Sequence, residues 1–358
     1  MLDLTASNPT ECGFTYDAQA ILAALANPAS LIYEPEPRGL LKAREAVCEY
    51  YAARGDNVSP DSVLLTTSTS EAYSYVFRLL CNPGDEILVP QPSYPLFDFL
   101  ADLQDVRLVR YPLLYDHGWQ IDFHALQQAI TPRTRGVIVV HPNNPTGHFC
   151  KPHEIEQLNN ICAPRGMAII ADEVFLDYPL SGHAPRSFAA NTGAPTFTMS
   201  GISKIAGLPQ MKAAWLAVSG PAALRDASLS RLEVIADTYL SMNAPVQHAL
   251  HALLQHRGSF QTQLLSRVRA NLAELDRQLA QQQACTRLAL EAGWYVVLRV
   301  PATRSDEELA LALLTAKGVY LHPGHFYDFP SGGFLIVSLI TPTAEFAQGA
   351  AELLTLLG

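Results

Sequence analysis

Lysine is scarce in this chain of 358 residues, which has five lysines, at positions 42, 151, 204, 212 and 317. The formal net charge is −10. Proteins that bind nucleic acid need clustered lysine and arginine to neutralise phosphates, and the sequence has no such cluster. We therefore expect no nucleic acid among its partners.

Long apolar runs and cysteine pairs are also lacking. No apolar stretch approaches the roughly 20 residues that a membrane-spanning helix needs, and MLDLTASNPTECGF is unlike a signal peptide. These features predict a cytoplasmic protein with no membrane partner. The six cysteines form no C-x-x-C pair and accompany no histidine cluster, so we expect neither a disulfide framework nor a metal site.

What the sequence does contain is typical of a compact enzyme, with 49% hydrophobic and 16% charged residues. Short apolar runs that predict strands alternate with helical patterns. Continuously apolar strands separated by helices indicate an α/β fold with a mainly parallel sheet, covered by helices on both faces. The expected strands are SVLLT, EILVP, GVIVVHP, MAIIADE and TFTMSG, and the expected helices are GLLKAREAVCEYYAARG, SEAYSYVFRLLC and PHEIEQLNNICAPRG.

The pattern changes after about residue 221, where the chain becomes strongly helical and then mixes strands such as ALEAGWYVVLRVP and FLIVSLI with further helices. This mixture predicts a second, smaller α+β domain. We expect an N-terminal segment at residues 1–38 that joins the small domain, a large domain at 39–255 and a small C-terminal domain at 256–358.

Polar motifs follow the expected strands, and ligands of parallel sheets bind beyond the carboxyl ends of the strands. TTSTSEA places hydroxyls at a helix N-terminus, which suits either an anion or a simple N-cap with Glu71 in the first turn. NNPTG is a turn by composition, yet its Asn144 is able to donate to a ligand oxygen. Asp172 ends an apolar run, where a carboxylate must cap a helix, meet an arginine or hold a ring nitrogen protonated.

Lys204 follows a buried strand and lies eight positions before Lys212. Removal from water lowers the pKa of a lysine and makes its amine nucleophilic, as a Schiff base requires. The alternative is a lysine whose stem packs while its charged end reaches solvent. The second lysine nearby and the other strand-end motifs favour the first interpretation.

In its ordered motifs the chain resembles the class I/II aminotransferases, which are pyridoxal-phosphate enzymes with the aspartate aminotransferase fold, also called fold type I. The resemblance extends over nearly the whole chain. Its landmarks are SNPTE, YEPEPRGLLKAREA, LLTTSTSEA, NPGDEILVPQPSYP, HPNNPTG, ADEVF, SGISK and a late PG before a strand.

The resemblance implies roles for particular residues around pyridoxal 5'-phosphate. Lys204 would form the Schiff base and then move the proton, Asp172 would pair with the pyridine nitrogen, and Asn144 would meet the phenolic oxygen. Tyr94 would stack on the ring, and Tyr33 would reach the phosphate of a neighbouring subunit, which implies a homodimer. The residues implied at the phosphate are Ser68, Thr69, Ser70, Ser203 and Lys212.

Several positions depart from the family pattern. Ser68 stands where glycine is usual, and Lys212 replaces an arginine, which gives a point charge instead of a two-pronged donor. Gly201 replaces a frequent serine. Phe175 replaces a tyrosine that donates to the phenolic oxygen, so we expect a higher pKa for the lysine–cofactor Schiff base than in relatives with the tyrosine.

The largest departure concerns the substrate carboxylate. The family has an arginine in the C-terminal strand, and the matching position in FLIVSLIT is Ile336. No arginine occurs from residue 305 to the end of the sequence. Because a buried carboxylate needs a charged partner, the substrate is either held differently or lacks that carboxylate. Arg38 and Arg299 are the candidate replacements, and each reads equally well as a surface or structural residue.

These observations favour an aminotransferase acting between an amino acid or amine and a 2-oxo acid. A lyase that eliminates across a carbon–sulfur bond, or a decarboxylase, would use the same cofactor residues, and the missing arginine keeps both open. A non-catalytic relative is the third hypothesis, against which the retention of Lys204, Asp172 and Asn144 together argues.

Overall fold

The structure is a computed structural model that describes residues 1–180, 182, 185–240 and 242–357. Its centre is an eight-stranded sheet with the order β2-β9-β8-β7-β6-β3-β4-β5 among these residues. Strands β4, β3, β6, β7 and β8 are parallel, whereas β9 is antiparallel to both β8 and β2. The strands are β2 (Val63–Thr66), β3 (Glu86–Gln91), β4 (Arg107–Tyr115), β5 (Trp119–Ile121), β6 (Thr134–Val140), β7 (Ala168–Asp172), β8 (Thr196–Gly201) and β9 (Ala214–Ser219).

The apolar runs explain the central strands. Strands β7 and β8 are buried along their whole length because helices cover both faces of the sheet. Sequence patterns did not predict β4, which mixes arginine and proline with apolar residues and is half-exposed. They also did not predict β5 and β9, which run antiparallel to their neighbours β4 and β8.

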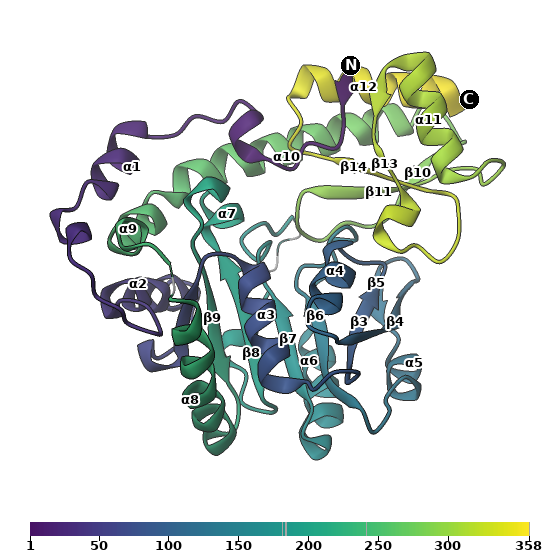
Figure 1. Cartoon of the computed structure of the whole chain (residues 1–358). Helices are drawn as coiled ribbons and strands as arrows, with labels where there is room; N and C mark the ends of the chain where they lie inside the picture. The colour runs from purple at the N-terminus through teal and green to yellow at the C-terminus, as the bar shows by residue number, and fades with distance from the viewer. Residues whose placement is uncertain (181, 183–184, 241, 358) are drawn as a thin grey trace.

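Helices flank this sheet, with α3 and α8 on its near face in Figure 1. The three helices that the sequence predicts in this domain begin at or close to the start of their patterns; α3, for example, begins after the N-cap Ser68. The helices of the N-terminal segment and the large domain are α1 (Ala18–Leu25), α2 (Leu41–Ala52), α3 (Thr69–Leu80), α4 (Leu96–Asp102), α5 (Phe123–Gln128), α6 (Pro152–Cys162), α7 (Ile202–Ile205), α8 (Ala222–Tyr239) and α9 (Ala244–Gln255). None of the described helices is long and apolar enough to cross a membrane.

The smaller unit lies above the large sheet in Figure 1, and the long helix α10 (Arg257–Leu279) leads into it from α9. Its antiparallel sheet has the order β10-β11-β14-β13, and β1 from the N-terminus pairs with β12. Its elements are β1 (Leu2–Asp3), β10 (Thr286–Arg287), β11 (Tyr295–Arg299), α11 (Asp306–Lys317), β12 (Val319–Tyr320), β13 (His322–Pro323), β14 (Phe334–Ser338) and α12 (Thr343–Leu357).

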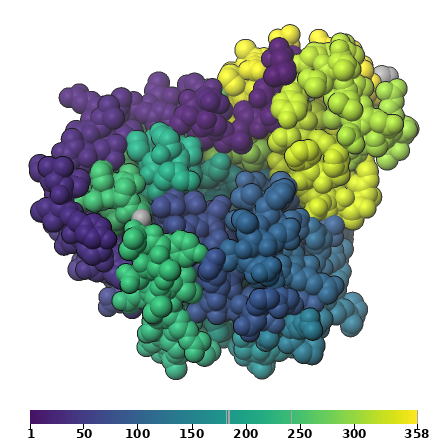
Figure 2. All heavy atoms as spheres, viewed as in Figure 1, coloured from purple at the N-terminus to yellow at the C-terminus, as the bar shows by residue number. Residues whose placement is uncertain are grey.

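The predicted fold class, a mainly parallel sheet between helices plus a smaller α+β unit, is confirmed. The first residues pack with the last part of the chain, since Ser338 N donates to Leu4 O at 2.7 Å. Figure 2 shows the same arrangement in space-filling form, with the purple N-terminal segment meeting the yellow C-terminal part above the large domain. The limits at residues 38 and 255 stay a prediction, although the large sheet lies between them.

Candidate active site

Five strand ends meet at one edge of the large sheet. Because β2 and β8 are both antiparallel to β9, they run the same way as β7, β6 and β3. A cavity of about 400 Å³ lies beyond their carboxyl ends. It is lined by Ser7, Ser68, Thr69, Ser70, Tyr94, Pro95, Phe97, Val140, Asn144, Asp172, Val174, Phe175, Gly201, Ser203, Lys204, Pro209, Ala214, Tyr295, His322, Phe326 and Tyr327.

Most of the residues that the sequence singled out line this one cavity, although they lie up to 136 positions apart along the chain. The members of the predicted set found there are Ser68, Thr69, Ser70, Tyr94, Asn144, Asp172, Phe175, Ser203 and Lys204. The topology brings them together, because each follows or ends a strand of the same sheet edge.

Lys204 lies in α7, directly after β8, with its side chain half-buried among aromatic rings. Its Nζ lies 5.0 Å from the centroid of the Trp294 ring and donates to Ser7 O at 3.2 Å. Burial lowers the pKa of Lys204 to about 8, against the opposing effects of Cys12 and Asp172. A larger fraction of its amine is therefore uncharged near neutral pH than in an ordinary lysine, which favours attack on a carbonyl.

Two glycines shape the segment around Lys204. A Cβ on Gly201 would come within 2.8 Å of the Cβ of Ala214, its partner in β9. The close approach of β8 and β9 thus explains why glycine stands where the family frequently has serine. Gly207 has φ +66°, and a Cβ there would come within 2.5 Å of the Phe260 ring.

Asp172 ends β7 and is buried, with 8% of its surface exposed. Its carboxylate accepts from Tyr73 Oη at 3.1 Å and from Val174 N at 3.2 Å. Burial raises the pKa of Asp172 to about 6, while these two hydrogen bonds and Lys204 act to lower it. No arginine pairs with Asp172 among the described residues, so the carboxylate is available to a cationic ring nitrogen in the cavity.

The N-terminus of α3 supplies the hydroxyl-rich wall. Ser68 caps the helix by accepting from Glu71 N at 3.2 Å, and Glu71 in turn accepts from Thr67 N at 2.6 Å. The N-cap interpretation is therefore correct for Ser68. Thr69 and Ser70 lie in the first turn and line the cavity, where the free N–H groups of a helix favour an anion.

Asn144 lies after β6 and is buried, with 7% of its surface exposed. Its Oδ1 is buried and has no hydrogen-bond partner among the described residues. A buried amide without a partner is costly, and the oxygen and nitrogen positions of an amide interchange by rotation. Asn144 therefore meets the cavity with an unsatisfied polar group, as expected of a residue that contacts a ligand.

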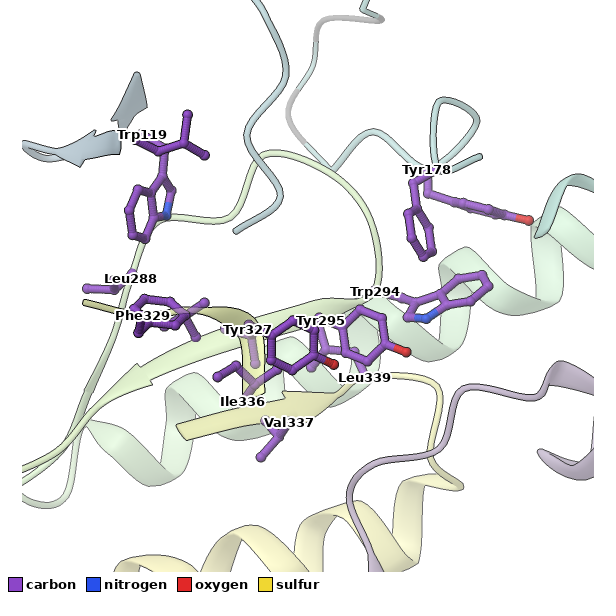
Figure 3. Close-up of a cluster of buried hydrophobic side chains, with 14 of the residues drawn as sticks. Trp119, Tyr178, Leu288, Trp294, Tyr295, Tyr327, Phe329, Ile336, Val337 and Leu339 are labelled. Atoms are coloured by element: carbon purple, nitrogen blue, oxygen red, sulfur yellow. The ribbon is translucent and has the colours of Figure 1, made fainter. Parts of the chain in front are cut away.

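The small domain contributes a wall that sequence reasoning missed, consisting of Tyr295, His322, Phe326 and Tyr327. Figure 3 shows Tyr295 and Tyr327 close together on one side of β14, and their ring centroids are 6.3 Å apart. Tyr73, which bonds Asp172, was also missed. Tyr73 lies four residues after Thr69, and this spacing places both side chains on one face of α3. The spacing could therefore have indicated that Tyr73 faces the site.

The two arginines that are candidates for binding the substrate carboxylate, Arg38 and Arg299, lie outside the cavity lining. Arg38 donates through Nε and Nη2 to Glu233 Oε2 at 2.9 and 2.6 Å, which occupies its guanidinium. Arg299 ends β11, is exposed, and lies over the ring of Phe334 at 5.7 Å. Neither lines the cavity. Strand direction places Arg299 at the far end of β11 from Tyr295. The carboxylate-binding role of these two arginines stays a prediction.

Lys212 and Tyr33 also lie outside the cavity lining. Lys212 is exposed in the left-handed region with φ 54°, two residues before Ala214, which lines the cavity. Tyr33 is 76% exposed. Ile336 is fully buried in β14 and carries no charge to the cavity.

Comparison with known proteins identifies the family of this chain. The chain matches the family described as aminotransferase class I and II over residues 2–351. The chain belongs to this family. The predicted family resemblance is confirmed.

Three known members illustrate the relationship. The glutamate-pyruvate aminotransferase AlaA of Escherichia coli strain K12 is 30% identical over 257 residues, which cover 71% of this chain and 63% of that protein. The alanine aminotransferase of Mycobacterium tuberculosis strain H37Rv is 27% identical over 366 residues, covering 99% of this chain and 84% of that protein. A solved alanine aminotransferase from Pyrococcus furiosus has a TM-score of 0.90 and 22% identity, covering 99% of this chain and 92% of that one.

Class I and II aminotransferases use pyridoxal phosphate, and the residues of the cavity fit it. The fit is seen in the unpartnered Oδ1 of Asn144, the buried carboxylate of Asp172 and the half-buried amine of Lys204. The helix N-terminus at Thr69 and Ser70 suits the phosphate. The predicted cofactor is thus confirmed at the level of the family to which the chain belongs.

Replacing Phe175, which lines the cavity, tests how the cavity sets the pKa of the lysine–cofactor Schiff base. Its ring is 4% exposed and meets Trp294 edge-on at 4.8 Å, so it offers no hydrogen bond where the family often has tyrosine. We expect Phe175→Tyr to lower the pKa of the lysine–cofactor Schiff base by about one unit, because the added hydroxyl stabilises the deprotonated form. A pH titration of the holoenzyme's visible absorbance measures this, and an unchanged or higher midpoint contradicts it.

Proposed function

We propose that this protein is a pyridoxal-phosphate-dependent aminotransferase, which moves an amino group between an amino acid or amine and a 2-oxo acid. The observation that carries the proposal is the meeting of Lys204, Asp172 and Asn144 in one cavity beside the N-terminus of α3. The names of the relatives agree with it, since they are alanine, glutamate-pyruvate and tyrosine aminotransferases.

Each of the three residues has its own role in the proposed reaction. Pyridoxal phosphate, when bound, draws electrons from the substrate carbon next to the transferred nitrogen. Lys204 Nζ would hold the cofactor covalently and would move a proton to and from that carbon. The carboxylate of Asp172 would keep the ring nitrogen protonated, and Asn144 would bind the phenolic oxygen.

Other residues hold and cover the cofactor. Thr69, Ser70 and Ser203 line the cavity and present hydroxyls to the phosphate, and Lys212 supplies a positive charge from the adjacent segment. Tyr94 lines the cavity, is 42% exposed, and would cover one face of the ring.

The purified protein tests this function directly. It should be yellow, lose its colour with borohydride, and convert its absorbance to that of the pyridoxamine form when an amino acid is added. Later addition of a 2-oxo acid should reverse this change. A yellow protein that shows no amino transfer with any member of a broad panel of amino acids and amines contradicts the proposal.

A lyase or decarboxylase acting on the same cofactor is the second candidate. It is favoured by one observation, namely that Lys204 is the only lysine or arginine that lines the described cavity. Such an enzyme would release ammonia with a keto acid, or carbon dioxide, without accumulating the pyridoxamine form. Product analysis on the same panel separates the two reactions.

We further propose a homodimer in which Tyr33 reaches the phosphate in the neighbouring subunit. The support is an exposed apolar group: Leu31, Ile32 and Leu240 are 91%, 65% and 71% exposed. Residues Ile32–Pro37 and Leu240 also line a hollow of about 290 Å³. In Figure 2 this segment forms the purple rim beside the green α8 and α9. Apolar surface gathered in this way is typical of a protein–protein interface.

Charged substitution of this group tests the dimer. We expect the double variant Leu31→Asp and Ile32→Asp to lower the mass in solution to that of one chain, because two buried carboxylates without partners oppose association. Light scattering of the holoprotein measures it. Leu311→Asp is the matched control, since Leu311 is 53% exposed in α11 and lies outside this group. A wild-type protein that is already monomeric would falsify the proposed dimer.

A further inference from the structure

No arginine is found among the described residues that line this cavity, so a substrate carboxylate meets no arginine among them. The family position, Ile336, is fully buried and uncharged, and Arg38 and Arg299 lie elsewhere. Lys204 lines the cavity but is committed to the cofactor in the proposed function, on which this inference rests. A carboxylate that leaves water without a donor is strongly disfavoured, so the cavity must offer another group.

His322 stands beside the position that the arginine would occupy. In the antiparallel pair of β13 and β14, His322 lies directly opposite Ile336. Side chains of directly opposed residues emerge on the same face of the sheet. Figure 3 shows that Ile336 points to the side of Tyr295 and Tyr327, whereas Val337 points away. The imidazole therefore lies on the cavity face, and His322 does line the cavity.

Neighbouring rings hold the imidazole in a fixed orientation. It stacks on Phe326 with centroids 5.5 Å apart and an interplanar angle of 8°, and Tyr320 meets its edge at 6.1 Å. Nδ1 lies 3.2 Å from Tyr327 Oη. The Tyr327 side chain is itself buried, with 4% of its surface exposed. An imidazole packed in this way loses little conformational entropy when it binds a ligand.

The contact with Tyr327 is compatible with two tautomers of the neutral imidazole. In the tautomer that the inference uses, the phenol hydroxyl donates to Nδ1 and the proton of the ring lies on Nε2. Nε2 makes no hydrogen bond to the described residues. In this tautomer the ring presents an N–H donor to the cavity without having to be charged.

We propose that His322, oriented by Tyr327, binds the carboxylate of the substrate in place of the missing arginine. The ligand class is a monocarboxylate whose remaining part packs against the aromatic wall of Tyr94, Tyr295 and Phe326. A donor of this kind grips the carboxylate by one hydrogen bond, whereas an arginine would use two. Substrates are accordingly selected by the apolar part as well as by the carboxylate.

Binding of unreactive probes to the yellow holoenzyme tests the inference separately from catalysis. Phenylacetate carries the carboxylate, and phenylacetamide is its uncharged analogue. In His322→Phe we expect calorimetry to show phenylacetate affinity lowered about tenfold or more, because a hydrogen bond to a charged group is lost. The preference for phenylacetate over phenylacetamide should fall by about fivefold.

Two further variants complete the experiment. His325→Phe is the matched control, because His325 is exposed in the same turn and does not line the cavity; it should bind both probes as the wild type does. His322→Arg should bind phenylacetate more tightly than the wild type, because a guanidinium is charged and can donate two hydrogen bonds to the carboxylate. Unchanged phenylacetate affinity in either His322 variant, or an equal loss of both probes in His322→Phe, overturns the inference. Failure of the proposed function would instead appear as a colourless protein or as absent amino transfer.

Discussion

Replacing Lys204 with alanine is expected to abolish amino transfer, with a loss of at least about a thousandfold. The reason is that the substitution removes both the covalent attachment of the cofactor and the group that moves the proton, and positioned proton transfer alone contributes about 10²–10⁴-fold. Steady-state amino transfer with added pyridoxal phosphate measures the effect. The borohydride reaction should also leave no cofactor bound to the chain.

Two lysine variants make the comparison specific. Lys42→Ala is the matched control, because Lys42 is exposed in α2 and far in sequence from the cavity motifs, and it should be fully active. Lys212→Ala should instead weaken cofactor binding by about tenfold while keeping turnover at saturating cofactor, in line with the loss of one charged contact. Retained turnover in Lys204→Ala would mean that another lysine bonds the cofactor.

Replacing Asp172 with asparagine is expected to change activity and stability in opposite directions. Activity should fall by two to three orders of magnitude, because breaking a buried charge pair costs about 3–5 kcal/mol and the ring nitrogen loses its partner. The cofactor-free protein, in contrast, should become more stable at neutral pH, because a carboxylate that burial disfavours has been removed.

The pH dependence gives the sign of the stability effect. Burial raises the pKa of Asp172 from 3.8 to about 6 in the folded chain, so the folded state holds its proton more tightly than the unfolded state. The resulting contribution to the free energy of unfolding is fully present below pH 3.8 and is lost as the pH rises through about 6. This difference corresponds to roughly 3 kcal/mol.

Urea denaturation of the cofactor-free wild type and Asp172→Asn at pH 5 and pH 8 measures this contribution. The wild type should lose more stability than the variant over this range. Glu173 is buried beside it, and its pKa is raised to about 8, chiefly by burial, but it is present in both proteins and cancels in the comparison. An equal loss of stability in both proteins would show that Asp172 ionises in the folded chain as easily as in water.

Much of the cofactor site could be predicted from the sequence. Asp172, Asn144 and Lys204 each stand at the end of an apolar run, and parallel strands bring such ends to one edge. The order of the motifs along the chain then indicated the family, and the comparison with known proteins confirms it. The sequence shows Gly201 only as a departure from the family pattern, because its close contact with Ala214 depends on a strand, β9, that the patterns do not predict.

The sequence by itself thus determined the fold class and the residues that follow the strands, because apolar periodicity and strand-end chemistry are local properties of the chain. The cofactor followed from the resemblance of the chain's ordered motifs to the family. Only the tertiary structure decided how the substrate side is built. It paired Arg38 with Glu233, and it placed His322 opposite Ile336 through the register of β13 and β14. Such contacts join residues that are distant in sequence, and strand register and domain packing set them, which no local pattern encodes.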